Sequence, residues 1–175
     1  MQNSFGINII PENENERQAA LKRYLIADTN AEPSFDNITK LATKIFKVPI
    51  SLISIVDVNT VYFKSNTGMG VENTSERGDS LCALSVLDPE VTVFEDALKN
   101  ACLLSNPNVA GNFGLRFYAG APLITHDGYL IGTICIIDKQ PRTFSDSEKE
   151  ILQSLAVSVM DQMECRLSSM KQVDK

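Results

Sequence analysis

The chain has 175 residues, of which 43% are hydrophobic and 22% are charged, a composition typical of one globular domain with its own core. Sixteen basic and 22 acidic residues give a net charge of −6 without a basic cluster, which argues against direct nucleic-acid binding. No apolar run reaches the roughly 18 residues that cross a bilayer, and the first residues lack a signal-peptide pattern, so we expect a cytoplasmic protein that binds no membrane.

Two helices are predicted after an irregular N-terminal arm over residues 1–13. The first runs from about Glu14 to Ala27 and carries an apolar stripe. The second begins near Pro33, which suits a first helical turn, and ends before Pro49. We therefore predict one domain over residues 14–170, followed by a short tail over residues 171–175.

Strand-forming residues follow the second helix. Residues 50–57 and 61–65 are rich in β-branched and aromatic side chains and predict an antiparallel pair. Residues 66–80 are expected to form a loop, and a short helix is expected to end near Val86. Residues 91–94 predict a short strand, and residues 95–113 a long connection with one helical turn, a length that is often functional.

A long hairpin is predicted over residues 114–138, with a two-residue turn at Asp127 and Gly128. This turn would place Tyr118 opposite Ile137, Gly120 opposite Cys135, Pro122 opposite Thr133, and Ile124 opposite Ile131. Both faces are too apolar for contact with water, so both should be covered. Small residues beside polar ones at Gly120 and Ala121 predict room for a pocket wall.

The last predicted element is a helix from Ser145, with Glu148 at capping-box spacing, to about Met170. Its apolar residues cover more than one stripe, which favours a second contact surface that forms a homodimer. The alternative is that one of the first two helices of the same chain covers the extra width. The predicted dimer residues are Ala156, Met160, Met163, Leu167 and Met170.

The order of these elements predicts an α+β fold, with a central antiparallel sheet and helices on both faces in a three-layer sandwich. The cysteines, at positions 82, 102, 135 and 165, include no Cys-x-x-Cys pair, so we expect reduced thiols. His126 is the only histidine and lies beside the hairpin turn. A metal site or haem ligation is therefore not expected.

Several stretches, in the right order, resemble the GAF domain family of small-molecule sensor modules, over about residues 14 to 168. The resemblance rests on residues 35–42, 48–54, 63–65 and 80–83, and above all on residues 116–123 and 131–133. It implies the three-layer fold and a ligand site between the sheet and the segments that cross it. Fold alone does not select a ligand.

Departures from subfamily patterns argue against several ligands and activities. Ala83 and Leu84 follow Cys82, where bilin-binding members have histidine directly after the linking cysteine. The Asn-Lys, Phe and Asp-Glu pattern of cyclic-nucleotide-binding members has no counterpart, and no histidine is placed to ligate haem. The methionine sulfoxide reductase branch would require a cysteine near Arg116, where the chain has none.

Several matching positions are candidates for the ligand site. Arg116 would present a planar fork to a carboxylate or phosphate, or would form a salt bridge to Asp96 or Asp79. Cys82 is either a reactive thiol or a buried one, and Asp96 is expected to cap the turn that follows it. The predicted ligand-binding residues are Phe63, Ser80, Cys82, Phe94, Asp96, Arg116, Tyr118 and Thr133.

These observations predict a non-enzymatic regulatory sensor that binds an unidentified small molecule. The terminal helix would pass the signal to a dimer partner, or to an effector domain or protein in trans. Two alternatives remain open: a ligand-free dimerisation module whose pocket is filled by side chains such as Phe63 and Phe94, and a thiol-dependent enzyme of the methionine sulfoxide reductase type.

Overall fold

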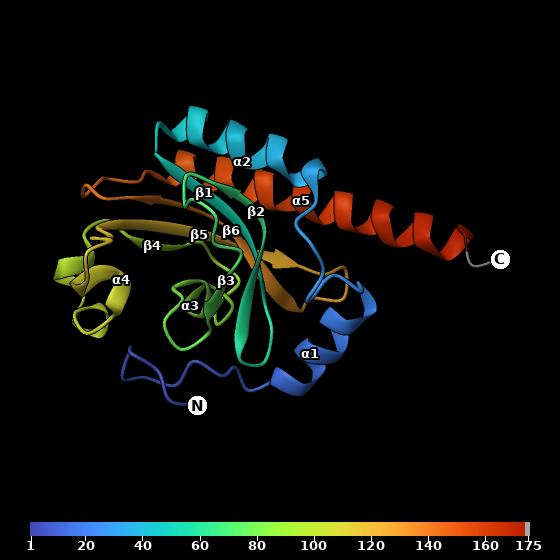
Figure 1. Ribbon diagram of the computed structural model, residues 1–175, viewed down its shortest axis with the longest axis horizontal. Helices are drawn as coiled ribbons and strands as arrows, with labels where there is room; N and C mark the ends of the chain where they lie inside the picture. Colours follow the sequence, from blue (N-terminus) through green and yellow to red (C-terminus); the bar gives the residue numbers. More distant parts are fainter. Residues whose placement is uncertain (174–175) are drawn as a thin grey trace.

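A six-stranded antiparallel sheet forms the middle layer of the protein, in the order β3-β2-β1-β6-β5-β4 (Figure 1). The computed structural model describes residues 1–173, with only the backbone of Val173. The predicted α+β class is confirmed. The strands are β1 (Ile50–Val56), β2 (Thr60–Thr67), β3 (Thr74–Glu76), β4 (Thr92–Phe94), β5 (Phe117–Ile124) and β6 (Leu130–Asp138).

Helices cover both faces of the sheet, as predicted. The long helices α2 (Pro33–Phe46) and α5 (Asp146–Val173) lie side by side over one face, called here the upper face, and α1 (Glu14–Arg23) packs at its end (Figure 1). The opposite, lower face is covered by loops and short helices. These are α3 (Cys82–Ser85), α4 (Pro107–Ala110) and the 3₁₀ turns η1 (Ala97–Lys99) and η2 (Ala101–Leu103).

Successive side chains of strands β5 and β6 point alternately into two cores, one on each face of the sheet. Phe117, Ala119, Ala121 and Leu123 of β5 lie in the upper core, and Tyr118 lies in the lower one. The arm before α1 also reaches the lower core. Its side chains Phe5 and Ile9 are buried there, although the sequence predicted only irregular backbone over residues 1–13.

The predicted hairpin register is correct from Tyr118 to Pro122 but wrong at its turn. Ile124 pairs with Leu130 rather than Ile131, because the register shifts by one residue after Leu123. In this turn only Gly128 has a positive φ, 89°. Its N–H donates to the carbonyl of Thr125, which marks a three-residue loop with a bulge instead of a two-residue primed turn.

Other boundaries also differ from the prediction. Helix α1 ends at Arg23 rather than Ala27, because Leu25 adopts a left-handed conformation with φ of 50°. Strand β3, at the sheet edge, was not predicted. Residues 171–173 continue α5 instead of forming part of a tail, and residues 174–175 lie outside the described residues.

Hydrogen bonds hold helix α5 at its start and again near Arg166. At its start, the Glu148 N–H donates to Ser145 Oγ and the Ser145 N–H donates to Glu148 Oε2, which confirms the capping box. Further along, the Arg166 guanidinium donates to Glu32 and to the carbonyls of Tyr24 and Leu25. Arg166 therefore holds the α1–α2 connection against α5.

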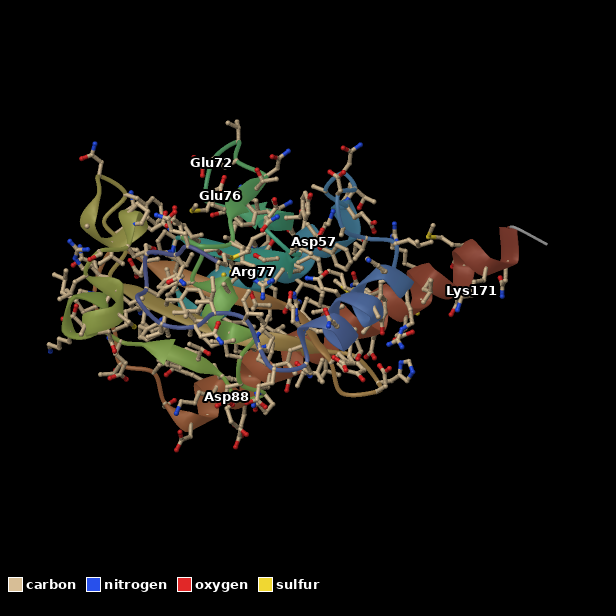
Figure 2. The ribbon with its side chains drawn as sticks, turned by 90° about the horizontal axis from the view of Figure 1, so that it is seen from below. Asp57, Glu72, Glu76, Arg77, Asp88 and Lys171 are labelled. Carbon is tan, nitrogen blue, oxygen red and sulfur yellow. The ribbon has the colours of Figure 1, made fainter. Side chains whose placement is uncertain are left out.

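A buried charge cluster of Glu14, Arg17 and Arg77 joins α1 to the strand ends. Arg17 is 1% exposed and Arg77 is completely buried (Figure 2), and both donate to the Glu14 carboxylate over 2.6–3.1 Å. Arg17 also donates to the carbonyl of Val56, and Arg77 to that of Asp57. Burial opposes ionisation of Glu14, but hydrogen bonds from Arg17 and Arg77 lower its pKa to about 2.

We predict that Glu14→Gln lowers the free energy of unfolding at pH 7 by about 3 kcal/mol, because two buried guanidinium groups lose their counter-charge. The folded pKa of Glu14 lies below its unfolded value of 4.5, so its contribution is present above 4.5 and is lost as the pH falls toward about 2. Urea unfolding at pH 7 and pH 3 measures both effects. The variant should lose less stability on acidification, and the exposed Glu16→Gln should behave like the unmodified protein; equal acid losses in all three would contradict the prediction.

Candidate functional site

The candidate site lies on the lower face, where α3 packs on β1, β5 and β6. Ser54 on β1 pairs with Thr133 on β6, and Cys135 stands two residues further along the same face. Cys82 at the start of α3 lies over these strands and donates its thiol to Ser54 Oγ at 3.5 Å. Each of these side chains is at most 3% exposed.

Hydroxyl groups surround the two thiols. Tyr118 Oη and Ser85 Oγ share a hydrogen bond of 2.8 Å. Thr133 Oγ1 is buried and has no hydrogen-bond partner in the described part of the chain. A buried hydroxyl without a partner is unfavourable in an apolar core, and Thr133 is completely buried two residues from Cys135 on β6. We call Ser54, Cys82, Ser85, Tyr118, Thr133 and Cys135 the lower-face polar cluster.

The two thiols of this cluster titrate as a pair. Interaction with the Cys135 thiol is the main effect that lowers the pKa of Cys82, with help from Ser54 and against the effect of burial. The same interaction, together with burial, raises the pKa of Cys135 well above its usual value. One proton is therefore lost more easily than the other, and Cys82 is the thiol that ionises first.

The room predicted at Gly120 is already filled. A Cβ atom on Gly120 would lie within 2.5 Å of both Tyr118 Oη and Ser85 Oγ. The glycine is thus required by the tyrosine ring that folds over it. The pocket wall predicted from small residues is instead a packing contact.

The space that remains is a cavity of about 40 Å³ under α3. Of the predicted ligand residues, Ser80, Cys82 and Tyr118 line it. Sequence reasoning missed the apolar residues around them, which carry no pattern that separates cavity lining from core. The lining is Leu52, Met69, Ser80, Leu81, Cys82, Asn108, Phe113, Leu115, Tyr118 and Ile137.

The other predicted ligand residues lie outside this cavity. Phe63 is buried in the lower core, and the Phe94 ring packs on Tyr118 at 6.3 Å between centroids. Asp96 caps η1 by accepting from the Leu98 N–H. Arg116 donates to the carbonyls of Val109 and Leu115, so in this structure it braces the segment after α4 instead of pairing with Asp96 or Asp79.

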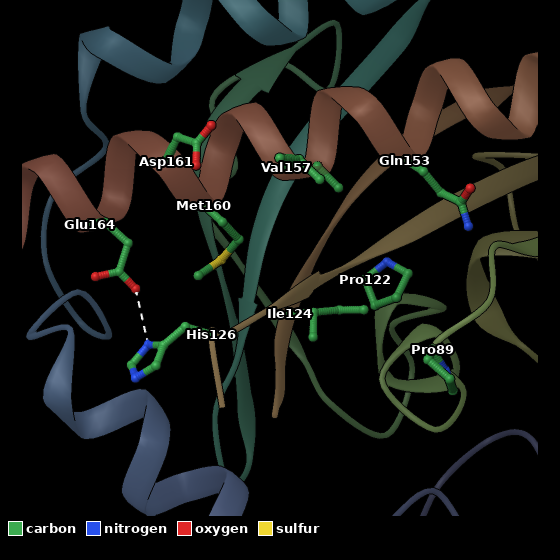
Figure 3. Close-up of a pocket in the computed structure, with 10 residues that line it drawn as sticks. Pro89, Pro122, Ile124, His126, Gln153, Val157, Met160, Asp161 and Glu164 are labelled. Carbon is green, nitrogen blue, oxygen red and sulfur yellow. Dashed lines mark ion pairs between the residues drawn. The ribbon is translucent and has the colours of Figure 1, made fainter. Parts of the chain in front are cut away.

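A larger groove of about 370 Å³ lies between α5 and the part of β5 beyond its pairing with β4 (Figure 3). Pro122 and Ile124 form one wall and Val157 and Met160 of α5 the other. At one end, His126 Nδ1 lies 3.6 Å from a carboxylate oxygen of Glu164. The sequence did not predict this groove, because it depends on how far β4 extends along β5.

Most of the predicted dimer residues are used inside one chain. Ala156, Met160 and Met163 are at most 7% exposed and belong to the upper core, where α1 and α2 also pack. Leu167 is half-buried and Met170 is 37% exposed. The chain's own core thus packs against the first three residues of the predicted seam, and a dimer contact through α5 stays a prediction.

Within residues 1–173, no cluster of three or more histidine, cysteine or acidic side chains could hold a metal ion. Over the same residues, none of the helices combines the length and apolar character needed to cross a bilayer.

The six-stranded antiparallel sheet, with long helices on one face and short segments on the other, defines a small α+β domain. A model of the GAF domain matches residues 30–162, and the chain belongs to the GAF domain family. This family supplies sensor and regulatory modules.

The chain is similar to several known proteins. The chain is 36% identical over 151 residues to a cyclic di-GMP phosphodiesterase from Pseudomonas aeruginosa, covering 86% of this chain but only 26% of that protein. The fold is similar to a GAF domain from an Acinetobacter phosphoenolpyruvate-protein phosphotransferase, with a TM-score of 0.59, 16% identity, and coverage of 91% of this chain and 96% of that one. It is also similar to the type II free methionine-R-sulfoxide reductase of Thermoplasma acidophilum, with a TM-score of 0.60, 18% identity, and coverage of 78% and 91%.

We predict that Gly120→Ala destabilises the protein by about 1–3 kcal/mol, because the new methyl group overlaps Tyr118 and Ser85. Thermal and urea unfolding measure the change. In a Tyr118→Phe/Ser85→Ala background, which removes both clashing oxygen atoms, the same substitution should cost less. An equal cost in both backgrounds would show that the glycine is required for another reason.

Proposed function

We propose that this chain is a non-enzymatic, cytoplasmic sensor domain that binds a small molecule between the sheet and the α3–α4 segments. The observation that carries the proposal is the lower-face cavity, whose wall includes Cys82 and Tyr118 of the lower-face polar cluster. The P. aeruginosa relative is named for a signalling enzyme, and the chain spans only about a quarter of it. This supports a regulatory role for the chain beside an effector, in the same protein or in trans.

The cavity limits what can bind without movement. Its volume of about 40 Å³ is enough to hold a water molecule, but is far below the 300 Å³ or more of typical metabolite pockets. A larger ligand would have to displace α3 and the segment around Asn108. These parts are held by short helices and side-chain hydrogen bonds, such as those from Asn106 and Asn108 to the Asp79 carbonyl.

A ligand-free scaffold is the second candidate. The packing of Tyr118 over Gly120 and of Phe94 on Tyr118 favours it, because side chains already fill most of the space. A thiol-dependent reductase is supported only by the shared fold. The chain has Arg116 where that branch would have its later cysteine.

We predict that native mass spectrometry of the purified protein detects a bound small molecule that is released on unfolding. Ser80→Val should fill the cavity and abolish the bound mass while the circular dichroism spectrum is unchanged. Ser75→Val, on the edge strand β3, is the matched control and should retain it. A protein that carries no molecule and is not stabilised by any compound of a metabolite thermal-shift screen would support the scaffold instead.

We also propose that the chain forms a homodimer through the second half of α5, where Leu167 and Met170 remain accessible. The double variant Leu167→Glu/Met170→Glu should shift the sedimentation coefficient to that of a monomer, because four charges would be brought together at a two-fold contact. The control is Val58→Glu, which adds a charge at an exposed residue outside α5. A monomeric unmodified protein, or a dimer that the α5 substitutions leave intact, would overturn this placement.

A further inference from the structure

Two of the four cysteines meet inside the lower-face polar cluster although they are 53 positions apart (135 − 82). Cys135 pairs with Leu52 on one side and with Gly120 on the other. Cys82 lies near these neighbours of Cys135. Its thiol donates to Ser54 Oγ, and it lines the cavity together with Leu52 and Tyr118. Gly120, opposite Cys135, has no side chain, and the space above it is occupied by Tyr118 Oη and Ser85 Oγ.

The cavity gives one of these thiols access to a very small molecule. Cys82 forms part of its wall, together with Ser80 and Tyr118. A volume of about 40 Å³ accommodates a molecule of two heavy atoms such as hydrogen peroxide, and is too small to enclose a metabolite-sized oxidant. Ser80 and Tyr118 carry the hydroxyl groups in the cavity wall that could hydrogen-bond a peroxide there.

We propose that Cys82 and Cys135 form a reversible disulfide when hydrogen peroxide enters this cavity, so that the domain senses a peroxide rather than a large metabolite. This inference rests on the proposed sensor function and names its effector. Cys82 is the attacking thiol, since it faces the cavity, and Cys135 on the rigid central strand β6 is the resolving one. The interaction between the two thiols lowers the pKa of Cys82 and raises that of Cys135, which agrees with Cys82 as the attacking thiol and Cys135 as the resolving one.

The chemistry balances without a further reactant. The Cys82 thiolate attacks one peroxide oxygen, the O–O bond breaks, and the departing hydroxide takes up a proton to form water. The Cys135 sulfur then attacks the sulfur of the Cys82 sulfenic acid, and the S–O bond breaks to release a second water. Two thiols lose two electrons and two protons in all, and one peroxide is reduced to two waters.

Disulfide formation would move α3 relative to the sheet. Cys82 opens α3, whereas Cys135 is fixed between β1 and β5, so a bond between them draws α3 onto the sheet. The movement closes the cavity and breaks the Cys82 contact with Ser54. The segments that follow α3 along the chain lead directly to β4 and the edge of the sheet.

The test is mass spectrometry of the reduced full chain after exposure to a small excess of hydrogen peroxide, with free thiols alkylated under denaturing conditions. We expect a peptide in which Cys82 and Cys135 are linked, and its loss on treatment with dithiothreitol. Cys82→Ser and Cys135→Ser should each abolish it, and Cys102→Ser and Cys165→Ser should not. If Cys82→Ser fails to fold, the linked peptide of the unmodified protein decides the question.

Two results would overturn the inference: Cys82 and Cys135 both alkylated after peroxide treatment, or Cys82 linked to Cys102 or Cys165. The proposed sensor function is tested separately by the co-purified ligand. A bound metabolite without the linked peptide would remove the peroxide inference and leave the sensor. A linked peptide without any bound metabolite would support peroxide as the effector.

Discussion

The fold depends on the burial of β5 and β6 from both sides. A shift of one residue in their pairing would exchange Phe117 and Ala119 with Tyr118 and Gly120, and so place a phenol in the apolar upper core. The pairing register of β5 and β6 is therefore fixed by the apolar upper core and by the more polar lower face together. The helices and connecting segments cover the sheet, with long helices on the upper face and short, hydrogen-bonded segments on the lower one.

The sequence predicted the parts of this structure that follow from periodicity. Helix α2, the strands β1 and β2, the hairpin register from Tyr118 to Pro122 and the capping box at Ser145 all carry local patterns with one physical solution. Strand β3 has no such pattern, because Thr74 and Glu76 on an edge strand remain exposed. Helix α1 ends at Arg23, and the carbonyls of Tyr24 and Leu25 just beyond it accept hydrogen bonds from Arg166, a contact between distant parts of the chain that no local signal reveals.

The candidate site was harder to predict. Ser80, Cys82 and Tyr118 could be placed at a cavity because they belong to motifs of the family, but its size depends on how neighbouring rings pack. Small residues at positions 120 and 121 indicated empty space, whereas Gly120 is small because Tyr118 occupies the volume above it. The excess apolar width of α5 likewise had two explanations, and the chain's own core packs against Ala156, Met160 and Met163.

The attachment of α5 has a mechanical consequence. The helix is capped at Ser145, packed on the sheet through its middle, and bound to the α1–α2 connection by Arg166. Its last seven residues, from Leu167 to Val173, extend about 10 Å beyond that final anchor, at about 1.5 Å per residue. Arg166 thus acts as a fulcrum. For a rigid helix held at this point, any change of its angle would displace the helix end sideways in proportion to the length beyond Arg166.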